Sequence, residues 1–133
     1  MNTESSPVHK VVIHKAGSYD KLHLEGQPLP EMGAHDVLVK NKAIGVNYAD
    51  VVVRMGLYQS AKDYVGWPIT PGFEFSGIVQ AVGSDVTEHA VGDAVFGVTR
   101  FGGYASHVCV PKHQVFALPH AMTAEEAAGF PAV

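Results

Sequence analysis

Residues 70–83 read TPGFEFSGIVQAVG, one of three stretches at which the sequence stops being generic. Apolar side chains alternate with small or polar ones from Phe73 to Val82, the pattern of a β-strand with one buried face. A long loop at 59–71 precedes this strand, and the turn Gly83-Ser84-Asp85 ends it. A strand bounded in this way favours a β-rich domain with tight corners.

Glycine and proline divide the rest of the chain in the same way. Fourteen glycines and eight prolines separate short apolar runs, which is typical of an all-β domain. Residues 36–45 predict a half-buried strand, because Val37 and Val39 would lie on one face and Leu38 and Lys40 on the other. Further strands are predicted at residues 8–15, 22–25, 94–98, 103–110 and 115–118.

Two short helices are indicated by their capping residues. Asn47 can cap a helix that runs to Arg54, and Gly56 is placed to end it. Three consecutive valines disfavour this helix locally, because β-branched side chains are restricted in a helix. Near the C-terminus, Thr123 and Glu126 form a capping box at the start of an apolar helix.

The composition is that of an ordinary globular domain. The chain has 133 residues, 47% hydrophobic and 17% charged, which suits one domain with its own core. A net charge of -4 without blocks of like charge gives no reason to expect a nucleic-acid partner. No apolar run reaches the roughly 20 residues that span a bilayer, and the N-terminus lacks the apolar core of a signal peptide. The single cysteine, Cys109, is expected to be an inert thiol and fits a cytoplasmic location.

The three distinctive stretches carry a family resemblance. They are GVNYADVVVRMGLY at 45–58, TPGFEFSGIVQAVG at 70–83 and FGGYASHVCVP at 101–111. In order and spacing they resemble the first half of a medium-chain dehydrogenase/reductase of the zinc-free quinone oxidoreductase type, a group that includes vesicle-amine-transport-like proteins. The resemblance runs from Val11 to Val133. It implies a mainly β fold, a GroES-like partly open β-barrel with a few short helices.

The resemblance also implies an activity, the NADPH-dependent reduction of a small-molecule quinone or enone without zinc. No G-x-G-x-x-G motif occurs in the chain, so most of the cofactor would be held by a Rossmann domain that the chain lacks. We therefore expect a GroES-like domain at 1–122, and at 123–133 the start of a helix linking to that domain. The isolated chain is expected to fold but to be inactive, without tight NADPH binding. Exposed Phe130 and Val133 favour a homo-oligomer.

Four residues are candidate site residues on the strength of the resemblance. Asn47 and Tyr58 match positions that face the nicotinamide cleft in zinc-free reductases, and they are the catalytic candidates. Asn47, Tyr48 and Asp50 are the cofactor-binding candidates. An amide can orient a carboxamide or a quinone oxygen, and a phenol can stabilise a developing anion. The alternatives are that Asn47 only caps the helix and that Tyr58 only covers the barrel mouth.

The zinc alcohol dehydrogenases, to which the chain is similar at lower resolution, differ at the positions that bind metal. Their first catalytic ligand corresponds to Asn47, the histidine of their Gly-His-Glu motif to Phe73, and their proton relay to Ala49. An amide is a poor zinc ligand and a phenyl ring is none, so no metal is expected. The structural zinc of those enzymes needs four close cysteines, and Cys109 is alone.

Several neighbouring residues have supporting parts in this interpretation. Asp50 and Glu74 match carboxylate positions of the zinc enzymes and are expected behind the site, each held by a backbone donor or by a cation such as Arg54. Tyr64 and Trp67, with Tyr48, could add aromatic walls. Two further functions stay open: a non-catalytic binding or scaffolding module, and a domain of a zinc-type alcohol dehydrogenase.

Overall fold

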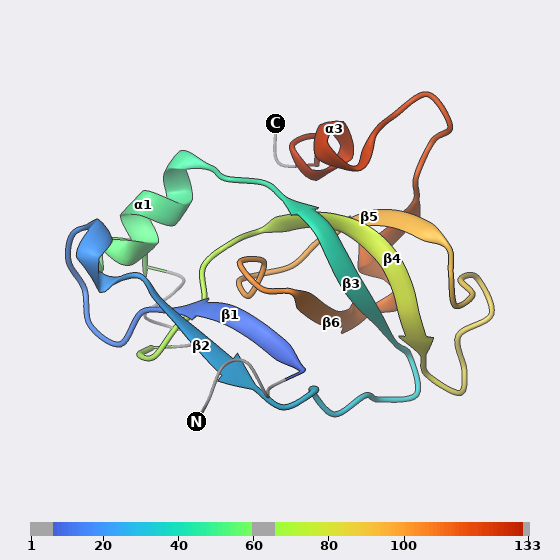
Figure 1. The fold of residues 1–133 in the computed structure, drawn as a ribbon, viewed down its shortest axis with the longest axis horizontal. Helices are drawn as coiled ribbons and strands as arrows, with labels where there is room; N and C mark the ends of the chain where they lie inside the picture. The colour runs from blue at the N-terminus through green and yellow to red at the C-terminus, as the bar shows by residue number, and fades with distance from the viewer. Residues whose placement is uncertain (1–6, 60–65, 132–133) are drawn as a thin grey trace.

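The protein, described here as a computed structural model over residues 7–59 and 66–131, is mainly β. A five-stranded antiparallel sheet in the order β6-β3-β4-β5-β7 curls into a half-barrel, and the two-stranded sheet β1-β2 lies beside it (Figure 1). The mainly β, GroES-like fold expected from the sequence is confirmed. The strands are β1 Val8–Val12, β2 His23–Gln27, β3 Asp36–Ile44, β4 Glu74–Val82, β5 Ala94–Val98, β6 His107–Pro111 and β7 Val115–Ala117.

The long central strands form where apolar side chains alternate most regularly with small or polar ones in the sequence. β3 and β4 pair in antiparallel register from Val37 opposite Val82 to Ile44 opposite Phe75. Their inward side chains, Val37, Val39, Phe75 and Val79, form the main core, at most 1% exposed. Leu38, predicted on the opposite face, is not part of this core cluster but is itself 4% exposed, and a register shift lies between it and Val39.

The predicted strand at 103–110 was wrong at its start, because β6 begins only at His107. Residues 104–106 hydrogen-bond to different segments: Tyr104 N–H donates to the Pro71 carbonyl and Ser106 N–H to the His9 carbonyl. The Ala105 N–H donates to the Gly103 carbonyl within the same segment, so the backbone turns here and does not extend as a regular strand. Similarly, the strand predicted at 8–15 ends at Val12, and the one predicted at 22–25 lies at His23–Gln27.

The two capped helices are confirmed. α1, Tyr48–Arg54, starts after an extended Asn47 and is followed by Gly56 at φ +77°. Its Val53 is buried with Ile13 and Ile69, so packing offsets the poor helix propensity of valine. Two 3-10 turns, Tyr19–Lys21 and Lys112–Gln114, complete the described elements.

The second helix, α3 at Ala124–Ala128, lies across the sheet formed by β3, β4 and β5 (Figure 1). Ala127 and Ala128 are fully buried there, and the Ser76 hydroxyl donates to the Ala124 carbonyl. Phe130 beyond it is 59% exposed, while Val133 falls outside the described residues. In the described part of the chain no helix is long and apolar enough to cross a membrane.

Candidate functional site

A buried polar cluster lies where β3 turns into α1 and meets the start of β4. The Asn47 side-chain nitrogen donates to Glu74 Oε1 at 2.9 Å, and the Asn47 backbone N–H donates to Asp50 Oδ2 at 2.9 Å. Glu74 is 1% exposed and Asp50 4% exposed. Asn47 is therefore held by two carboxylates, one at its side chain and one at its backbone.

The segment just before β6 also contributes to this cluster, through the side chain of Tyr104. The Tyr104 hydroxyl donates to Asp50 Oδ2 at 2.8 Å, while Asp50 Oδ1 is buried with no hydrogen-bond partner in the described structure. Burial and then the bond to Asp50 raise the pKa of the Tyr104 phenol above its ordinary value. Tyr104 can approach because Gly72 has no side chain; a Cβ there would lie 2.7 Å from the Tyr104 ring.

Tyr104 was not among the residues expected at the site. Its hydrogen bond joins positions 54 residues apart, a separation that no local pattern reports. The expectation that Asp50 is held by a backbone donor is confirmed by the Asn47 N–H. Arg54, named as a possible cationic partner, donates to the Gly17 carbonyl at 3.1 Å.

Tyr58 belongs to an aromatic cluster formed with Phe73 and Phe101. Its ring lies edge-on to Phe73 and Phe101, with centroids 5.9 Å and 6.1 Å away, and the Phe73 and Phe101 centroids are 5.2 Å apart. Phe73 immediately precedes Glu74, so the contacts of Tyr58 and those of Asn47 meet at consecutive residues. A cleft lined by both Asn47 and Tyr58 stays a prediction.

The remaining candidates differ in accessibility. Tyr48, at the first position of α1, is 81% exposed, and its neighbour Val46 is 73% exposed. Trp67 is 43% exposed. Tyr64 lies outside the described residues. The Tyr48 side chain is thus accessible from solvent, whereas the carboxylate of Asp50 lies beneath the surface.

The ligand types that bind metals do not gather in the described residues. No group of three or more histidine, cysteine or acidic side chains is positioned to hold an ion there. At the position of Asn47 the polar atoms bond to Glu74 and Asp50 within the chain. Cys109 is half-buried in β6, and burial raises the pKa of its thiol, which disfavours the reactive thiolate.

Comparison with known proteins gives the same neighbours by sequence and by structure. A family model described as "Alcohol dehydrogenase GroES-like domain" matches residues 33–120. The "Synaptic vesicle membrane protein VAT-1 homolog" of Rattus norvegicus is 40% identical over 124 residues, covering 92% of this chain and 30% of the relative.

Two solved structures superpose closely. The human synaptic vesicle membrane protein VAT-1 homolog-like protein gives a TM-score of 0.88 at 35% identity, covering 96% of this chain and 40% of that one. The Escherichia coli quinone oxidoreductase complexed with NADPH gives a TM-score of 0.83 at 31% identity, covering 90% and 36%.

This chain therefore spans less than half the length of each of these relatives. The matched segment 33–120 contains the whole half-barrel sheet, together with Asn47, Tyr58, Glu74 and Tyr104. The chain belongs to the alcohol dehydrogenase GroES-like domain family, within the medium-chain dehydrogenase/reductase superfamily and its group of quinone oxidoreductases and VAT-1 homologs.

Proposed function

We propose that this chain is the substrate-binding domain of an NADPH-dependent, zinc-independent reductase of quinones or enones, working in the cytoplasm. The observation that carries the proposal is the buried network of Asn47, Glu74, Asp50 and Tyr104. It fixes a side-chain amide at the start of a helix, and its Glu74 directly follows Phe73 of the aromatic cluster of Tyr58. The superfamily membership and the NADPH complex of the E. coli relative support the choice of reaction.

The residues present suit a bound nicotinamide and an acceptor carbonyl. The amide nitrogen of Asn47 carries two N–H groups, and one of them is engaged by Glu74. The other is available to orient a carboxamide or an acceptor oxygen. The exposed ring of Tyr48 offers a surface for cofactor contact, and Asp50 holds the Asn47 backbone in place.

NADPH, when bound, supplies the hydride, and the protein supplies alignment and charge stabilisation. The Tyr58 hydroxyl makes no hydrogen bond within the described residues, so it is free to donate one to the oxygen of the acceptor. That bond strengthens as negative charge develops on the oxygen. Phe73 and Phe101 pack against the edges of the Tyr58 ring and fix its orientation.

The decisive experiment uses the chain with its natural continuation and screens quinones and enones with NADPH and NADH. We expect NADPH-linked reduction, with Tyr58→Phe lowering kcat by about tenfold or more and leaving thermal stability almost unchanged. Tyr19→Phe is the matched control, because Tyr19 is 78% exposed and outside the cluster. Equal rates for Tyr58→Phe and the wild type would remove Tyr58 from the proposed site.

A binding or scaffolding role is the second candidate, because the 40% identical rat relative is named for synaptic vesicle membranes. Absence of turnover with every acceptor would favour it. The zinc alcohol dehydrogenase alternative is tested separately, by elemental analysis of the purified protein. We expect no stoichiometric zinc and no loss of stability with a chelator, whereas about one zinc per chain would overturn zinc independence.

A further inference from the structure

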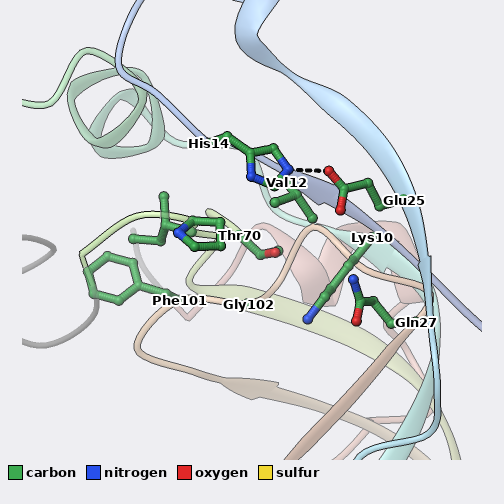
Figure 2. Close-up of a pocket in the computed structure, with 10 residues that line it drawn as sticks. Lys10, Val12, His14, Glu25, Gln27, Thr70, Phe101 and Gly102 are labelled. Atoms are coloured by element: carbon green, nitrogen blue, oxygen red, sulfur yellow. Dashed lines mark hydrogen bonds and ion pairs between the residues drawn. The ribbon is translucent and has the colours of Figure 1, made fainter. Parts of the chain in front are cut away.

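A hollow lies between the β1-β2 sheet and two loops (Figure 2). Its volume is about 420 Å³, within the range of small-molecule sites. One wall is a single face of the sheet, with Lys10, Val12 and His14 on the β1 side and Glu25 and Gln27 on the β2 side. The alternate spacing of these residues explains why they share that face.

The opposite wall is built from the loops at 68–70 and 101–102. Backbone hydrogen bonds fix it: Ile13 and Ile69 exchange two, at 2.8 and 2.9 Å, and Gly102 N–H donates to the Thr70 carbonyl at 2.8 Å. Phe101 holds a φ of 137°, a backbone conformation unusual for a residue with a side chain. The groove is therefore shaped by the fold before any ligand arrives.

The charges in this groove are arranged unusually. Lys10 stands directly opposite Glu25 in the strand register, where a lysine and a glutamate would normally pair. Glu25 instead pairs with His14 (Figure 2). Within the described structure the Lys10 ammonium group makes no ion pair or hydrogen bond, and neither the Gln27 side chain nor the Thr70 hydroxyl makes a hydrogen bond.

Three donors without acceptors thus line the groove, beside the His14–Glu25 pair and an apolar wall. Val12 and Ile69 are 5% and 3% exposed, and the Phe101 ring and Pro68 extend the apolar wall. An ammonium has three donors and no acceptor, so its natural complement is an oxygen anion. A smaller hollow shares Lys10, Gln27 and Thr70 and leaves room for a longer ligand.

We propose that this groove binds a small carboxylate with an apolar body, its oxygens on Lys10, Gln27 and Thr70 and its body on Val12, Ile69 and Phe101. The hydrogen bond between His14 and Glu25 keeps the competing carboxylate away from Lys10. The groove shares no residue with the polar cluster around Asn47, although Phe101 also contacts Tyr58, and the proposal does not depend on the proposed reductase activity.

The test is an NMR titration of the ¹⁵N-labelled chain with phenylacetate at neutral pH. We expect saturable shifts at the amides of Val12, Thr70 and Gly102. Phenylacetamide, which lacks the charge, and acetate, which lacks the apolar body, are each expected to bind more weakly. Shifts that centre on other residues, no saturable shifts, or equal binding of the amide would overturn the proposal.

Substitutions distinguish charge-specific binding in the groove from nonspecific binding. Lys10→Gln should weaken phenylacetate binding by about fivefold, the upper range for a partly exposed ion pair, while Lys42→Gln on β3 removes the same charge outside the groove and should change nothing. Glu25→Gln, which removes the competing carboxylate, should tighten binding. His14→Asn, which frees Glu25 to pair with Lys10, should weaken it.

If a variant at Lys10 does not fold, as judged by its spectrum, Thr70→Val gives an independent readout. It removes one donor, keeps the side-chain shape, and should weaken binding about twofold to fivefold. Unchanged affinity in Thr70→Val together with unchanged affinity in Glu25→Gln would refute the assigned position of the carboxylate.

Discussion

At Gly45 the backbone passes so close to its neighbours that no side chain fits. A Cβ at this position would lie 2.1 Å from Glu74 Oε1 and 2.4 Å from the Ala128 carbonyl oxygen. We expect Gly45→Ala to lower the free energy of unfolding by about 1–3 kcal/mol, because both neighbours must move. Urea denaturation measures this. Gly129→Ala, whose Cβ would meet its nearest atom at 3.9 Å, is the control and should change little.

The raised pKa of Tyr104 predicts how the stability of the fold changes at alkaline pH. Its phenol pKa is raised above the ordinary 10.0, first by burial and then by the hydrogen bond to Asp50. The folded chain therefore holds this proton more tightly than the unfolded chain. The resulting stability is fully present below pH 10 and is lost as the pH rises through the folded pKa.

The variant Tyr104→Phe separates these effects. At pH 7 it removes a donor from Asp50, whose other oxygen already lacks a partner, and should cost about 1–3 kcal/mol. Above pH 10 the stability of Tyr104→Phe should fall less steeply than that of the wild type. Parallel pH profiles of the two proteins would show that another group controls the alkaline transition.

Sequence patterns could identify part of this site and not the rest. Asn47 was predicted as a helix cap because capping depends on neighbours within one turn, and its cap position is confirmed. The bond from Tyr104 to Asp50 depends on two distant segments that approach at Gly72, so only the folded chain reveals it. The catalytic roles of Asn47 and Tyr58 stay predictions.

Among the elements, α3 has a capping box whose contribution to stability can be measured. Thr123 Oγ1 accepts from the Glu126 N–H at 3.1 Å, and Glu126 Oε1 accepts from the Thr123 N–H at 3.0 Å. We expect Thr123→Ala to cost about 1 kcal/mol and Thr123→Ser, which keeps the hydroxyl, to recover most of it. Chemical denaturation measures both, and equal losses in the two variants would contradict a capping role.

Elements defined by local patterns were predicted better than elements defined by partners. β4 starts one residue after its predicted start and ends where predicted. Its alternating apolar side chains and the turns that flank it all lie within one continuous segment of sequence. Residues 103–106 do not form a strand, because the Ala105 N–H bonds back to the Gly103 carbonyl and the Tyr104 N–H bonds to the distant Pro71 carbonyl. The register shifts in β3 likewise depend on its partner strand β4 and could not be predicted from β3 alone.

At the scale of the whole molecule, an aromatic patch remains open beside α3. Phe96 contacts Phe116 and Phe130, with ring centroids 5.5 Å and 6.4 Å apart, and the last two residues are 46% and 59% exposed. We propose that the isolated chain associates through this patch, since exposed apolar surfaces of this kind favour contact. Phe130→Ser should shift the population toward monomer in light scattering, whereas Phe101→Leu, away from the patch, should not. An unchanged assembly in Phe130→Ser would exclude this surface.

The adjacency of Phe73 and Glu74 has a consequence for how the sequence of this domain can vary. One peptide bond separates the ring that touches Tyr58 from the carboxylate that holds Asn47. A substitution that shifts the start of β4 therefore disturbs both partners at once, even when it suits one of them. Changes at positions 47 and 58 should for that reason be tolerated in combination more often than singly, so the two positions are expected to covary among descendants of this domain.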